Sequence, residues 1–457
     1  MKQNLVGKSG GAKSSASTAS PARLLAFEIL RRVEEGSAFA SLLLASREAE
    51  LQPNDRGLCH ELVMGVLRRR LWLDRLIAHY ANRDPERLDL AVRIALRLGL
   101  YQLRFLSRVP ASAAVNESVK LVRVARVRSA DVLVNAVLRR ATREPEYDPV
   151  VALADPLERI AVETSHPLWL IDRGAKAFGV DETAAFAQAN DATPSVAFRV
   201  IQNRASESEV IQAIRAAGAV VSPSRLTPAA WRAEGSTKIV RQLALEGVVY
   251  VQDEASQLVA HVLAAKEGER ILDVCAAPGS KSTHIADLTN DKAFIVSGDV
   301  HEHRLRTLTT IAATQRFRSI HAVNMDGTGE LPFAESSFDR VLVDAPCTGT
   351  GTLQRNPEIR WRISPADIEN LSARQFHILV SASRMVKPGG RLVYSTCSVE
   401  PEENEQVVGR FLKQTNGFEP MVLSVNPALL CSLGVARIWP HRDKAEGFFI
   451  AALERHQ

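Results

Sequence analysis

The sequence predicts a multi-domain protein with an all-α N-terminal domain, a small α+β middle segment and a C-terminal doubly wound α/β domain. Three observations predict this fold class. The chain has 457 residues, which is more than one hydrophobic core usually serves. Apolar residues recur at helical spacing over the first third of the chain, and after residue 247 short apolar runs alternate with longer helical patterns. We therefore expect a tail over residues 1–20 and domains over residues 21–145, 157–246 and 247–457.

The first twenty residues are rich in Ser, Ala, Gly and Lys and lack the apolar stretch of a signal peptide, so we expect a flexible tail. Hydrophobic residues make up 46% and charged residues 24% of the chain, which is the balance of an ordinary soluble protein. No apolar run in the sequence approaches the roughly 20 residues that span a bilayer. These features predict a cytoplasmic protein that does not bind membranes, and we expect a monomer.

From residue 21 to about residue 143 the apolar positions have the spacing of amphipathic helices, as in Leu62, Val66 and Leu67. Strand-like alternation is almost absent there, so this domain is predicted to be all helical. The next segment, residues 144–156, contains three prolines and several acidic residues, which is typical of a linker.

Positive charge is concentrated in the N-terminal part of the chain. Residues 1–150 contain 25 Lys and Arg against 16 Asp and Glu, whereas the remaining residues contain 32 against 36. Because phosphate contacts dominate nucleic-acid affinity, this asymmetry favours a polyanion such as RNA as a partner. Ordinary solvated helix faces are the alternative interpretation. The clustered basic residues are Arg68, Arg69, Arg70, Lys120, Arg123, Arg126, Arg128, Arg139, Arg140 and Arg143.

The middle segment combines a helical pattern over residues 169–179 with a strand-like run over residues 196–200. In the C-terminal domain six apolar runs are predicted to be buried parallel strands. These runs cover residues 271–275, 294–297, 320–323, 341–344, 391–396 and 448–453. Residues 304–315 and 368–386 are long enough for crossover helices. Ligands of such sheets bind beyond the carboxyl ends of the strands.

A glycine-containing turn follows the first of these strands. Pro278 fixes φ in this turn, and Gly279 lacks the Cβ that would keep a ligand from the backbone. Exposed N–H groups at the start of the next helix favour an anionic group such as a carboxylate. The turn alone is a weak signal, because it is neither GxGxxG nor GxxxxGK[ST] and such turns also have purely structural reasons.

Aspartates end three successive strands. Asp299 is placed to accept two ribose hydroxyls, Asp326 to meet an adenine amino group, and Asp344 ends the fourth strand. Each alone is more typical of a turn or a helix cap. In series they indicate a ligand that contains adenosine. Since no segment is suited to cradle a triphosphate, S-adenosylmethionine is favoured over ATP.

Cysteines stand at positions 59, 275, 347, 397 and 431. They form no CxxC pair and are odd in number, so neither a zinc site nor a disulfide framework is indicated. A lone cysteine after a strand is usually a small buried apolar residue. Cys347 and Cys397, however, follow the fourth and fifth predicted strands, which are neighbours in this kind of sheet, so both thiols are expected to face one pocket.

Two thiols in one pocket suit covalent methyl transfer to cytosine. C5 of cytosine is a poor nucleophile, so a thiolate adds to C6, C5 attacks the methyl group, and a base removes the C5 proton. Lys281 is a candidate for giving one cysteine thiolate character, and Asp344 is a candidate for hydrogen bonding to the base. The chemistry alone does not assign the two cysteine roles.

Five segments of the C-terminal domain are distinctive: Asp-Val-Cys-Ala-Ala-Pro-Gly-Ser-Lys at 273–281, Asp-Ala-Pro-Cys-Thr-Gly-Thr-Gly at 344–351, Arg-Asn-Pro-Glu at 355–358, Tyr-Ser-Thr-Cys-Ser at 394–398 and Glu-Glu-Asn-Glu at 402–405. This combination resembles the RNA cytosine-C5 methyltransferases. Three helical-domain segments, at 55–62, 116–119 and 134–140, resemble the NusB-like domain of the bacterial Sun/Fmu (RsmB-type) 16S ribosomal RNA methyltransferases. The resemblance covers nearly the whole chain after residue 20.

The resemblance implies NusB-like and middle RNA-binding domains, a Rossmann-like class I methyltransferase domain, S-adenosylmethionine as cofactor, 16S ribosomal RNA as partner, and no metal. It implies that Cys397 is the nucleophile and that Cys347 helps to release the product, whereas the Pro-Cys cysteine is the nucleophile in DNA cytosine methyltransferases. The residues that match the family's cofactor contacts are Cys275, Ala276, Ala277, Pro278, Gly279, Ser280, Lys281, Asp299, Asp326 and Asp344, with Arg304 near them.

The chain departs from the family pattern at three positions. Ser280 replaces the second glycine of Pro-Gly-Gly-Lys, a change that we expect to be tolerated. Glu446 replaces the aspartate of Asp-Gly-Phe-Phe, and Ile201 replaces the asparagine of Arg-Val-Asn. We expect the change at Ile201 to alter RNA contacts of the middle segment. Residues 252–256 match a further family segment, whose acidic residues we interpret as structural.

The leading hypothesis is C5 methylation of a cytosine in 16S ribosomal RNA, in a loop whose base unstacks into the pocket. One alternative is the same chemistry on transfer RNA; the NusB-like domain favours ribosomal RNA, but only by analogy. The other is a non-catalytic RNA-binding assembly protein. The presence of both cysteines and the whole carboxylate series argues against that alternative.

Overall fold

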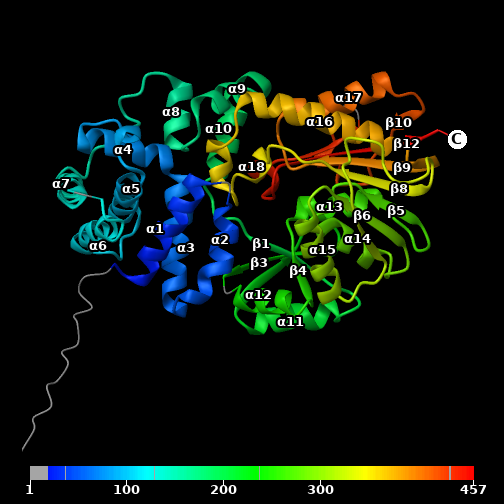
Figure 1. The fold of residues 1–457 in the computed structure, drawn as a ribbon, viewed down its shortest axis with the longest axis horizontal. Coiled ribbons are helices and arrows are strands. Elements are labelled where there is room, and N and C mark those ends of the chain that lie inside the picture. Colours follow the sequence, from blue (N-terminus) through cyan, green and yellow to red (C-terminus); the bar gives the residue numbers. More distant parts are fainter. Residues whose placement is uncertain (1–18, 37, 128, 236, 432–433, 457) are drawn as a thin grey trace, which may run out of the picture. The chain divides into compact units, whose positions relative to one another are not determined.

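The computed structural model describes residues 19–36, 38–127, 129–235, 237–431 and 434–456 (Figure 1). The flexible tail expected over residues 1–20 lies almost wholly outside the described residues. The chain forms two compact units, Met1–Asp172 and Arg173–Gln457. None of the described helices combines the length and apolar character needed to cross a bilayer. The domain boundaries expected from the sequence stay predictions.

The first unit is helical, as predicted. Its α-helices are α1 (Pro21–Glu35), α2 (Ala40–Arg47), α3 (Pro53–Arg68), α4 (Arg70–Ala81), α5 (Leu90–Phe105), α6 (Ala111–Val124), α7 (Ala130–Arg143) and α8 (Pro156–Glu163), with 3-10 turns at Glu48–Glu50 and Pro85–Arg87. The central helix α5 packs against α1, α3, α4, α6 and α7. Asp89 caps its start by accepting a hydrogen bond from the Ala91 N–H (2.8 Å).

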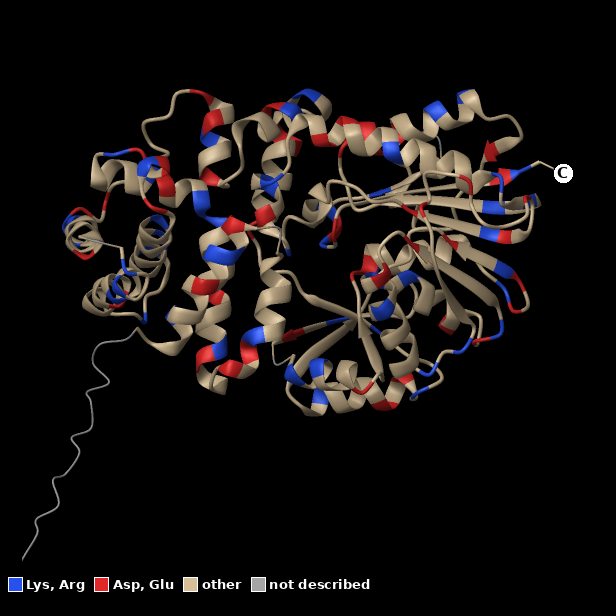
Figure 2. Cartoon of the chain, in the orientation of Figure 1, with Lys and Arg blue, Asp and Glu red and all other residues tan. Residues whose placement is uncertain are grey.

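Many basic side chains of this unit pair with carboxylates of the same unit. Of the clustered residues, Lys120 pairs with Glu117 (2.8 Å), Arg123 with Asp131 (3.1 Å) and Arg140 with Glu144 (3.0 Å). Arg68 is buried, and Arg128 lies outside the described residues. Figure 2 shows both signs of charge on these helices. The interpretation of this charge as an RNA-binding surface stays a prediction.

The boundary between the two units falls within α9, and a small α+β segment starts with this helix. Its elements are α9 (Leu168–Phe178), α10 (Val180–Ala189), β1 (Val196–Val200), α11 (Glu207–Ala216), β2 (Ala219–Pro223), β3 (Ala230–Gly235), α12 (Lys238–Leu245) and β4 (Val249–Val251). From β1 the order is βαββαβ, and the antiparallel sheet has the order β2-β3-β1-β4, which is a ferredoxin-like arrangement. Phe198 and Val200 pack in one core with residues of α11 and α12. The intervening Arg199 contacts Thr283 and Asp287 instead.

The rest of the second unit is an α/β domain. Its main elements are α13 (Glu254–Leu263), β5 (Arg270–Asp273), α14 (Ser280–Leu288), β6 (Phe294–Asp299), α15 (Glu302–Thr314), β7 (Ile320–Asn324), β8 (Phe338–Asp344), α16 (Pro365–Ser383), β9 (Val386–Thr396), α17 (Glu405–Gln414), β10 (Phe418–Pro420), β11 (Ala436–Ile438), α18 (Pro440–Asp443) and β12 (Phe448–Arg455). Short 3-10 helices are η4 (Thr350–Thr352), η5 (Pro357–Trp361), η6 (Pro401–Glu403) and η7 (Pro427–Leu429).

The sheet order is β10-β12-β9-β8-β5-β6-β7, with β11 paired to β12. The five strands from β5 to β9 are parallel, as predicted. Alternate residues of the strands belong to two cores, one shared with α13 and α14 and the other with α16 and α17. Helices therefore cover both faces, and the doubly wound fold is confirmed. The strand order reverses between β5 and β8, which is where ligands of such sheets bind.

Two expectations about the strands are wrong. β12 was expected to be parallel, but it pairs antiparallel with β9. A parallel strand needs a long crossover connection before it, but only the short α18 separates β12 from β11. The chain therefore turns back after β11, and β12 pairs antiparallel with it. β7 was expected to be buried, but its residues are exposed or half-buried because it is the edge strand.

Candidate active site

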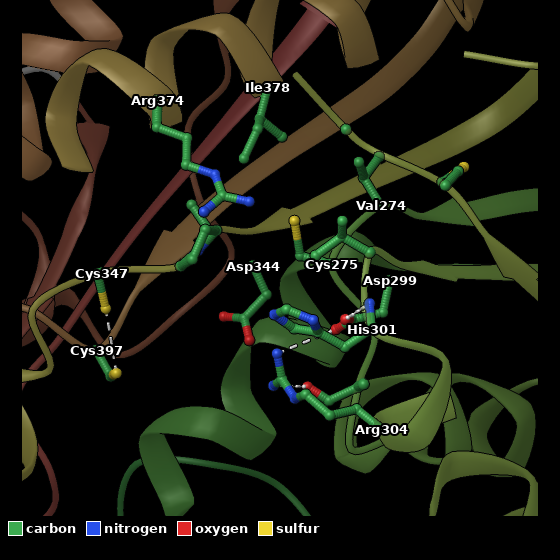
Figure 3. Close-up of a pocket in the computed structure, with 16 residues that line it drawn as sticks. Val274, Cys275, Asp299, His301, Arg304, Asp344, Cys347, Arg374, Ile378 and Cys397 are labelled. Atoms are coloured by element: carbon green, nitrogen blue, oxygen red, sulfur yellow. Dashed lines mark hydrogen bonds and ion pairs between the residues drawn. The ribbon is translucent and has the colours of Figure 1, made fainter. Parts of the chain in front are cut away.

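A cavity of about 230 Å³ opens at the carboxyl ends of the parallel strands (Figure 3). The sequence-predicted residues that line it are Cys275, Ala277, Asp299, Arg304, Asp344, Cys347 and Cys397. The predicted residues that do not line it are Ala276, Pro278, Gly279, Ser280, Lys281 and Asp326. The structure thus gathers both predicted cysteines and two of the three strand-end aspartates in one cavity.

The turn after β5 is shaped by packing between elements. Gly279 has φ of 109°, a conformation that favours glycine, and a Cβ built on it would lie 2.8 Å from the Leu308 Cγ of α15. The space that this glycine leaves is therefore filled by Leu308. The Ala276 N–H donates to the Gly298 carbonyl oxygen (2.7 Å), which ties the turn to the end of β6.

Asp299 and Arg304 connect the end of β6 to the same turn. The Asp299 carboxylate accepts a hydrogen bond from the His301 N–H (2.8 Å) and lies 3.2 Å from a guanidinium nitrogen of Arg304. Arg304 also donates to the Ala277 carbonyl oxygen (2.7 Å). These contacts hold the buried carboxylate at the wall of the cavity, as Figure 3 shows. Asp299 can still accept further hydrogen bonds, since each carboxylate oxygen has two acceptor sites.

Asp326 lies in an exposed turn after β7. Its carboxylate accepts hydrogen bonds from the Thr328 N–H (2.9 Å) and hydroxyl (2.8 Å), and these bonds hold the pKa of Asp326 below its usual value. Its neighbours Met325 and Gly327 line the cavity, although Asp326 itself does not. The contact expected between Asp326 and adenine stays a prediction.

Lys281 and Asp344 form an ion pair beside the cavity. The Lys281 Nζ lies 2.7 Å from the Asp344 Oδ2, and the Ser395 hydroxyl donates to the Asp344 Oδ1 (2.8 Å). Burial lowers the pKa of Lys281, but attraction to Asp344, and then to Cys397 and Asp273, outweighs it and raises the pKa above its usual value. Lys281 is therefore a fixed ammonium group near one of the two thiols.

Cys347 and Cys397 meet because their strands are parallel neighbours. Asp344 of β8 pairs with Ser395 of β9, and each cysteine follows a few residues beyond that pair. Their sulfur atoms are 3.3 Å apart (Figure 3). The hydrogen bond to Cys397, followed by burial, raises the pKa of Cys347 well above its usual value. The pocket shared by both thiols, expected from the sequence, is confirmed.

Asp273 and Cys275 are two further titratable groups, at the end of β5 and in the turn that follows; Cys275 lines the cavity and Asp273 does not. Burial raises the pKa of Asp273 to about 7, although the Ser282 hydroxyl donates to its carboxylate (2.7 Å). Burial and the nearby carboxylates raise the pKa of the Cys275 thiol above its usual value. Cys275 therefore stays a neutral thiol, unsuited to nucleophilic attack.

Several lining residues were not singled out from the sequence: Val274, Val300, His301, Met325, Gly327, Arg374 and Ile378. Arg374 and Ile378 are four residues apart on α16, so they share one face of this crossover helix. That spacing is the signal that sequence analysis could have used. In Figure 3 the Arg374 side chain extends from α16 toward the cavity.

Of the positions that depart from the family pattern, Ile201 is buried, whereas Ser280 and Glu446 are half-buried. Ile201 is 0% exposed, so its side chain is not placed to contact RNA, and the expectation of altered contacts there is wrong. Glu446 forms an ion pair with Arg355 (2.8 Å), which also approaches Asp253 (3.4 Å). Burial, and then repulsion by Asp253, raises the pKa of Glu446 to about 7. Asp253 also caps α13 by accepting from the Ala255 N–H (3.0 Å), the structural role expected for it.

Metal ligands do not gather in the described parts of the chain: no group of three or more His, Cys, Asp or Glu side chains there could hold a metal ion.

Three family models match the chain. The NusB family matches residues 20–143, the ferredoxin-like domain of the RsmF/B-like methyltransferases matches residues 166–239, and the 16S rRNA methyltransferase RsmB/F model matches residues 260–454.

Whole-length relatives are also found. "Probable ribosomal RNA small subunit methyltransferase B" of Bacillus subtilis is 36% identical over 95% of this chain and 98% of its own length. The protein of the same name from Synechocystis is 37% identical over 95% of this chain and 99% of its own. The crystal structure of PH0851 superposes with a TM-score of 0.83, at 29% identity, over 96% of this chain and all of that one.

Proposed function

Because this chain belongs to the RsmB/F family of 16S rRNA methyltransferases, we propose that it methylates C5 of one cytosine in 16S ribosomal RNA through a covalent cysteine adduct. The observation that carries this proposal is the pair of thiols, 3.3 Å apart, in a cavity that Asp299 and Asp344 also line. Neither thiol is needed for a methyl transfer that proceeds by direct attack, whereas an adduct at C6 needs one thiol to attack.

S-adenosylmethionine would supply the electrophilic methyl group. The residues present fit this cofactor, because Asp299 is held at the cavity wall with acceptor sites left for the ribose hydroxyls. Met325 and Gly327 offer an apolar border for the adenine ring, in agreement with an adenine site at the end of β7. The turn from Cys275 to Ala277 would then lie next to the amino-acid part of the cofactor.

We assign the attack on C6 to Cys397. Cys347 lies within hydrogen-bonding distance of the Cys397 sulfur, and the raised pKa of Cys347 means that it is the thiol that keeps its proton. Attraction to Cys397 is one of the causes that raise the pKa of Lys281, so a charged ammonium group lies near the thiol that we assign to the attack. Asp344 forms an ion pair with Lys281 and lines the same cavity as Cys397. We assign to it the hydrogen bond from the cytosine amino group.

We assign product release to Cys347. Once the Cys397 sulfur is bonded to C6, its hydrogen bond no longer raises the pKa of Cys347. Cys347 can then lose its proton to solvent and accept the proton from C5. The electron pair of the C5–H bond re-forms the C5=C6 double bond, and the bond from C6 to the Cys397 sulfur breaks.

The target base has to leave its stack to reach this cavity. A cytosine in a loop of 16S ribosomal RNA suits this requirement, because an unpaired base costs least to unstack. The net positive charge of residues 1–150 would attract the surrounding phosphates.

Bisulfite sequencing of ribosomal and transfer RNA from a deletion strain tests the proposal. We expect the loss of one 16S cytosine mark, restored by the wild-type gene and not by a Cys397→Ala gene made to the same protein level. An unchanged 16S profile would contradict the ribosomal substrate, and loss of a transfer RNA mark instead would identify the alternative substrate. Restoration of the mark by Cys397→Ala would contradict the assignment of Cys397 as the nucleophile.

A further inference from the structure

A buried carboxylate lies behind the two cysteines. Glu403, the last residue of η6, is 0% exposed, and four donors converge on its side chain. Its Oε1 accepts hydrogen bonds from the Thr348 N–H (2.9 Å) and from the Gln375 Nε2 (2.9 Å). Its Oε2 accepts from the Thr348 hydroxyl (2.5 Å) and from the Ser398 hydroxyl. Four donors on two oxygens fit an ionised carboxylate, because a buried charge is tolerated only when it is fully hydrogen-bonded.

Two of the three residues whose groups donate to the Glu403 carboxylate are next to the two cysteines. Thr348 directly follows Cys347, and Ser398 directly follows Cys397. The loop after β8 and the loop after β9 are therefore held by the same carboxylate. Gln375 of α16 strengthens this link, since its other amide hydrogen bond goes to the Pro346 carbonyl oxygen (2.9 Å), on the far side of Cys347.

The neighbouring Asn404 forms side-chain hydrogen bonds to the two residues on either side of Cys397. Its side chain accepts a hydrogen bond from the Thr396 hydroxyl (2.5 Å) and donates to the Ser398 carbonyl oxygen (2.9 Å), so it holds the two residues that flank Cys397. Asn404 therefore acts within one loop, whereas Glu403 joins the two loops.

We propose that Glu403 is a positioning residue, whose carboxylate holds the two cysteine loops in the relative placement at which their thiols touch. This inference rests on the proposed function, because it concerns a reaction that needs both thiols. Glu403 forms a hydrogen bond with neither sulfur and acts through Thr348 and Ser398. Joining the loops matters because a displacement of about 1 Å in a reacting group can cost about 100-fold in rate.

The charge of Glu403 has a second effect. It is one of the causes that raise the pKa of Cys347, after the Cys397 hydrogen bond and burial. Glu403 thus helps to keep the Cys347 thiol protonated. The titratable and charged groups around the two thiols are Tyr394 on β9, Glu403 on η6, Asp344 on β8, Lys281 on α14 and Arg374 on α16.

Disulfide formation between the two cysteines measures their placement without RNA or cofactor. Diamide takes two protons and two electrons from the thiols and is itself reduced to the hydrazine, while the S–S bond forms in place of the two S–H bonds. We would follow the Cys347–Cys397 peptide by mass spectrometry in the full-length wild type, Glu403→Ala, Glu403→Gln and the control Glu402→Gln. Glu402 is the preceding residue on η6, is part-exposed and pairs with Arg173, so its replacement removes a neighbouring charge without touching the loops.

For Glu403→Ala we expect disulfide formation to slow about tenfold or more and kcat to fall about 100-fold, with KM values for RNA and S-adenosylmethionine within about threefold of wild type. Glu403→Gln should recover much of the placement, because its amide oxygen can replace Oε1 while the two hydroxyls rotate to accept from its NH₂ group. In this variant iodoacetamide should modify Cys347 at lower pH than in wild type, since the charge is gone. Glu402→Gln should match wild type in each assay.

Three results would overturn the inference: kcat of Glu403→Ala within about twofold of wild type, a fallen kcat with an unchanged disulfide rate, or a loss confined to KM. If Glu403→Ala does not fold, Ser398→Ala and Thr348→Val decide the question: Ser398→Ala removes the hydrogen bond from the β9 loop to the carboxylate, and Thr348→Val removes one of the two hydrogen bonds from Thr348, whose N–H still donates to Glu403. Disulfide formation as fast as in wild type in both would refute the role. The disulfide rate needs no methyl transfer, so it stays readable even if the proposed 16S activity is refuted.

Discussion

The Lys281 Nζ lies 2.7 Å from the Asp344 Oδ2. Lys281 is on α14, which follows β5, and Asp344 ends β8; the sheet order reverses between these two strands. This ion pair brings a cation to the wall that also carries the two thiols. Burial lowers the pKa of Lys281, and attraction to Asp344 raises it. Removal of the Asp344 charge should therefore change the charge state of Lys281.

Asp344→Asn should lower the pKa of Lys281 and reduce kcat about 100-fold. The lysine loses its charge at lower pH in this variant, so the alkaline limb of the pH–rate profile should move to lower pH. The profile is measured between about pH 6 and pH 10. Ser395→Ala is the matched control, since it removes the other hydrogen bond to Asp344 without a change of charge. An alkaline limb at the same pH in Asp344→Asn would contradict this role of the ion pair.

Cys397→Ala should abolish methylation, a loss of roughly 10⁴-fold or more, because no thiolate then adds to C6. Transfer of a radioactive methyl group to a 16S RNA fragment checks this, with Cys431→Ala as the control because Cys431 is exposed and does not line the cavity. Residual methylation near the wild-type rate would show that Cys397 is not the nucleophile.

Cys347→Ala should trap the enzyme on its RNA. Attack and methyl transfer still occur in this variant, but the C5 proton is not removed, so the adduct accumulates. The complex should survive denaturing electrophoresis and should disappear after ribonuclease treatment or in the Cys347→Ala, Cys397→Ala double variant. Normal turnover of Cys347→Ala, or an adduct that persists in the double variant, would refute the assignment of roles.

Asp273→Asn should make the stability of the folded protein less dependent on pH. The pKa of Asp273 is raised from 3.8 to about 7 in the folded state, so the folded protein binds this proton more tightly than the unfolded chain does. Its contribution to stability is therefore present at low pH and is lost as the pH rises to about 7. That rise in pKa corresponds to about 4 kcal/mol at most.

Melting temperatures of wild type and Asp273→Asn between pH 5 and pH 8.5 test this. Wild type should lose more stability than the variant as the pH rises. Part of the dependence should remain in the variant, because the pKa of Glu446 is also raised to about 7 and acts in the same direction. Parallel curves for the two proteins would count against the linkage.

Gly279→Ala should destabilise the protein by about 2–3 kcal/mol or more, since a Cβ there meets the Leu308 Cγ at 2.8 Å and the Leu308 Cα at 3.2 Å. Gly268→Ala is the matched control: Gly268 also has a positive φ, of 79°, but no atom lies within 4 Å of its Cβ position. Denaturant unfolding of both variants separates the clash from the backbone strain. Equal losses of stability would mean that Leu308 moves aside without cost.

The sequence predicts the parts of this molecule that follow from parallel strand order. Cys347 and Cys397 come together because β8 and β9 are adjacent and in register, and that adjacency follows from a run of βα units. Asp299 and Asp344 reach the cavity for the same reason. The direction of β12 was missed because an apolar run reads the same in both directions, and the exposure of β7 because its edge position depends on the whole sheet order.

Side-chain contacts between segments distant in sequence could not be predicted from the order of the strands. The link from Glu403 to Thr348 spans 55 residues, and the link from Glu403 to Gln375 spans 28. The family resemblance includes Glu403 in a recognisable segment, but nothing in its spacing indicates which loops it joins. Ile201 was misjudged likewise, because burial at one strand end depends on the domain packed against it.

The antiparallel insertion of β12 next to β9 also bears on biosynthesis. β9 leads directly to Cys397. On one side β9 pairs with β12, which comes later in the sequence than all the other described strands. Until Phe448–Arg455 has emerged from the ribosome, β9 has an unpaired edge, and such an edge is a site for aggregation. The catalytic sheet therefore cannot be completed on β9 before β12 has emerged, and β9 keeps this unpaired edge during synthesis of the residues between Thr396 and Phe448.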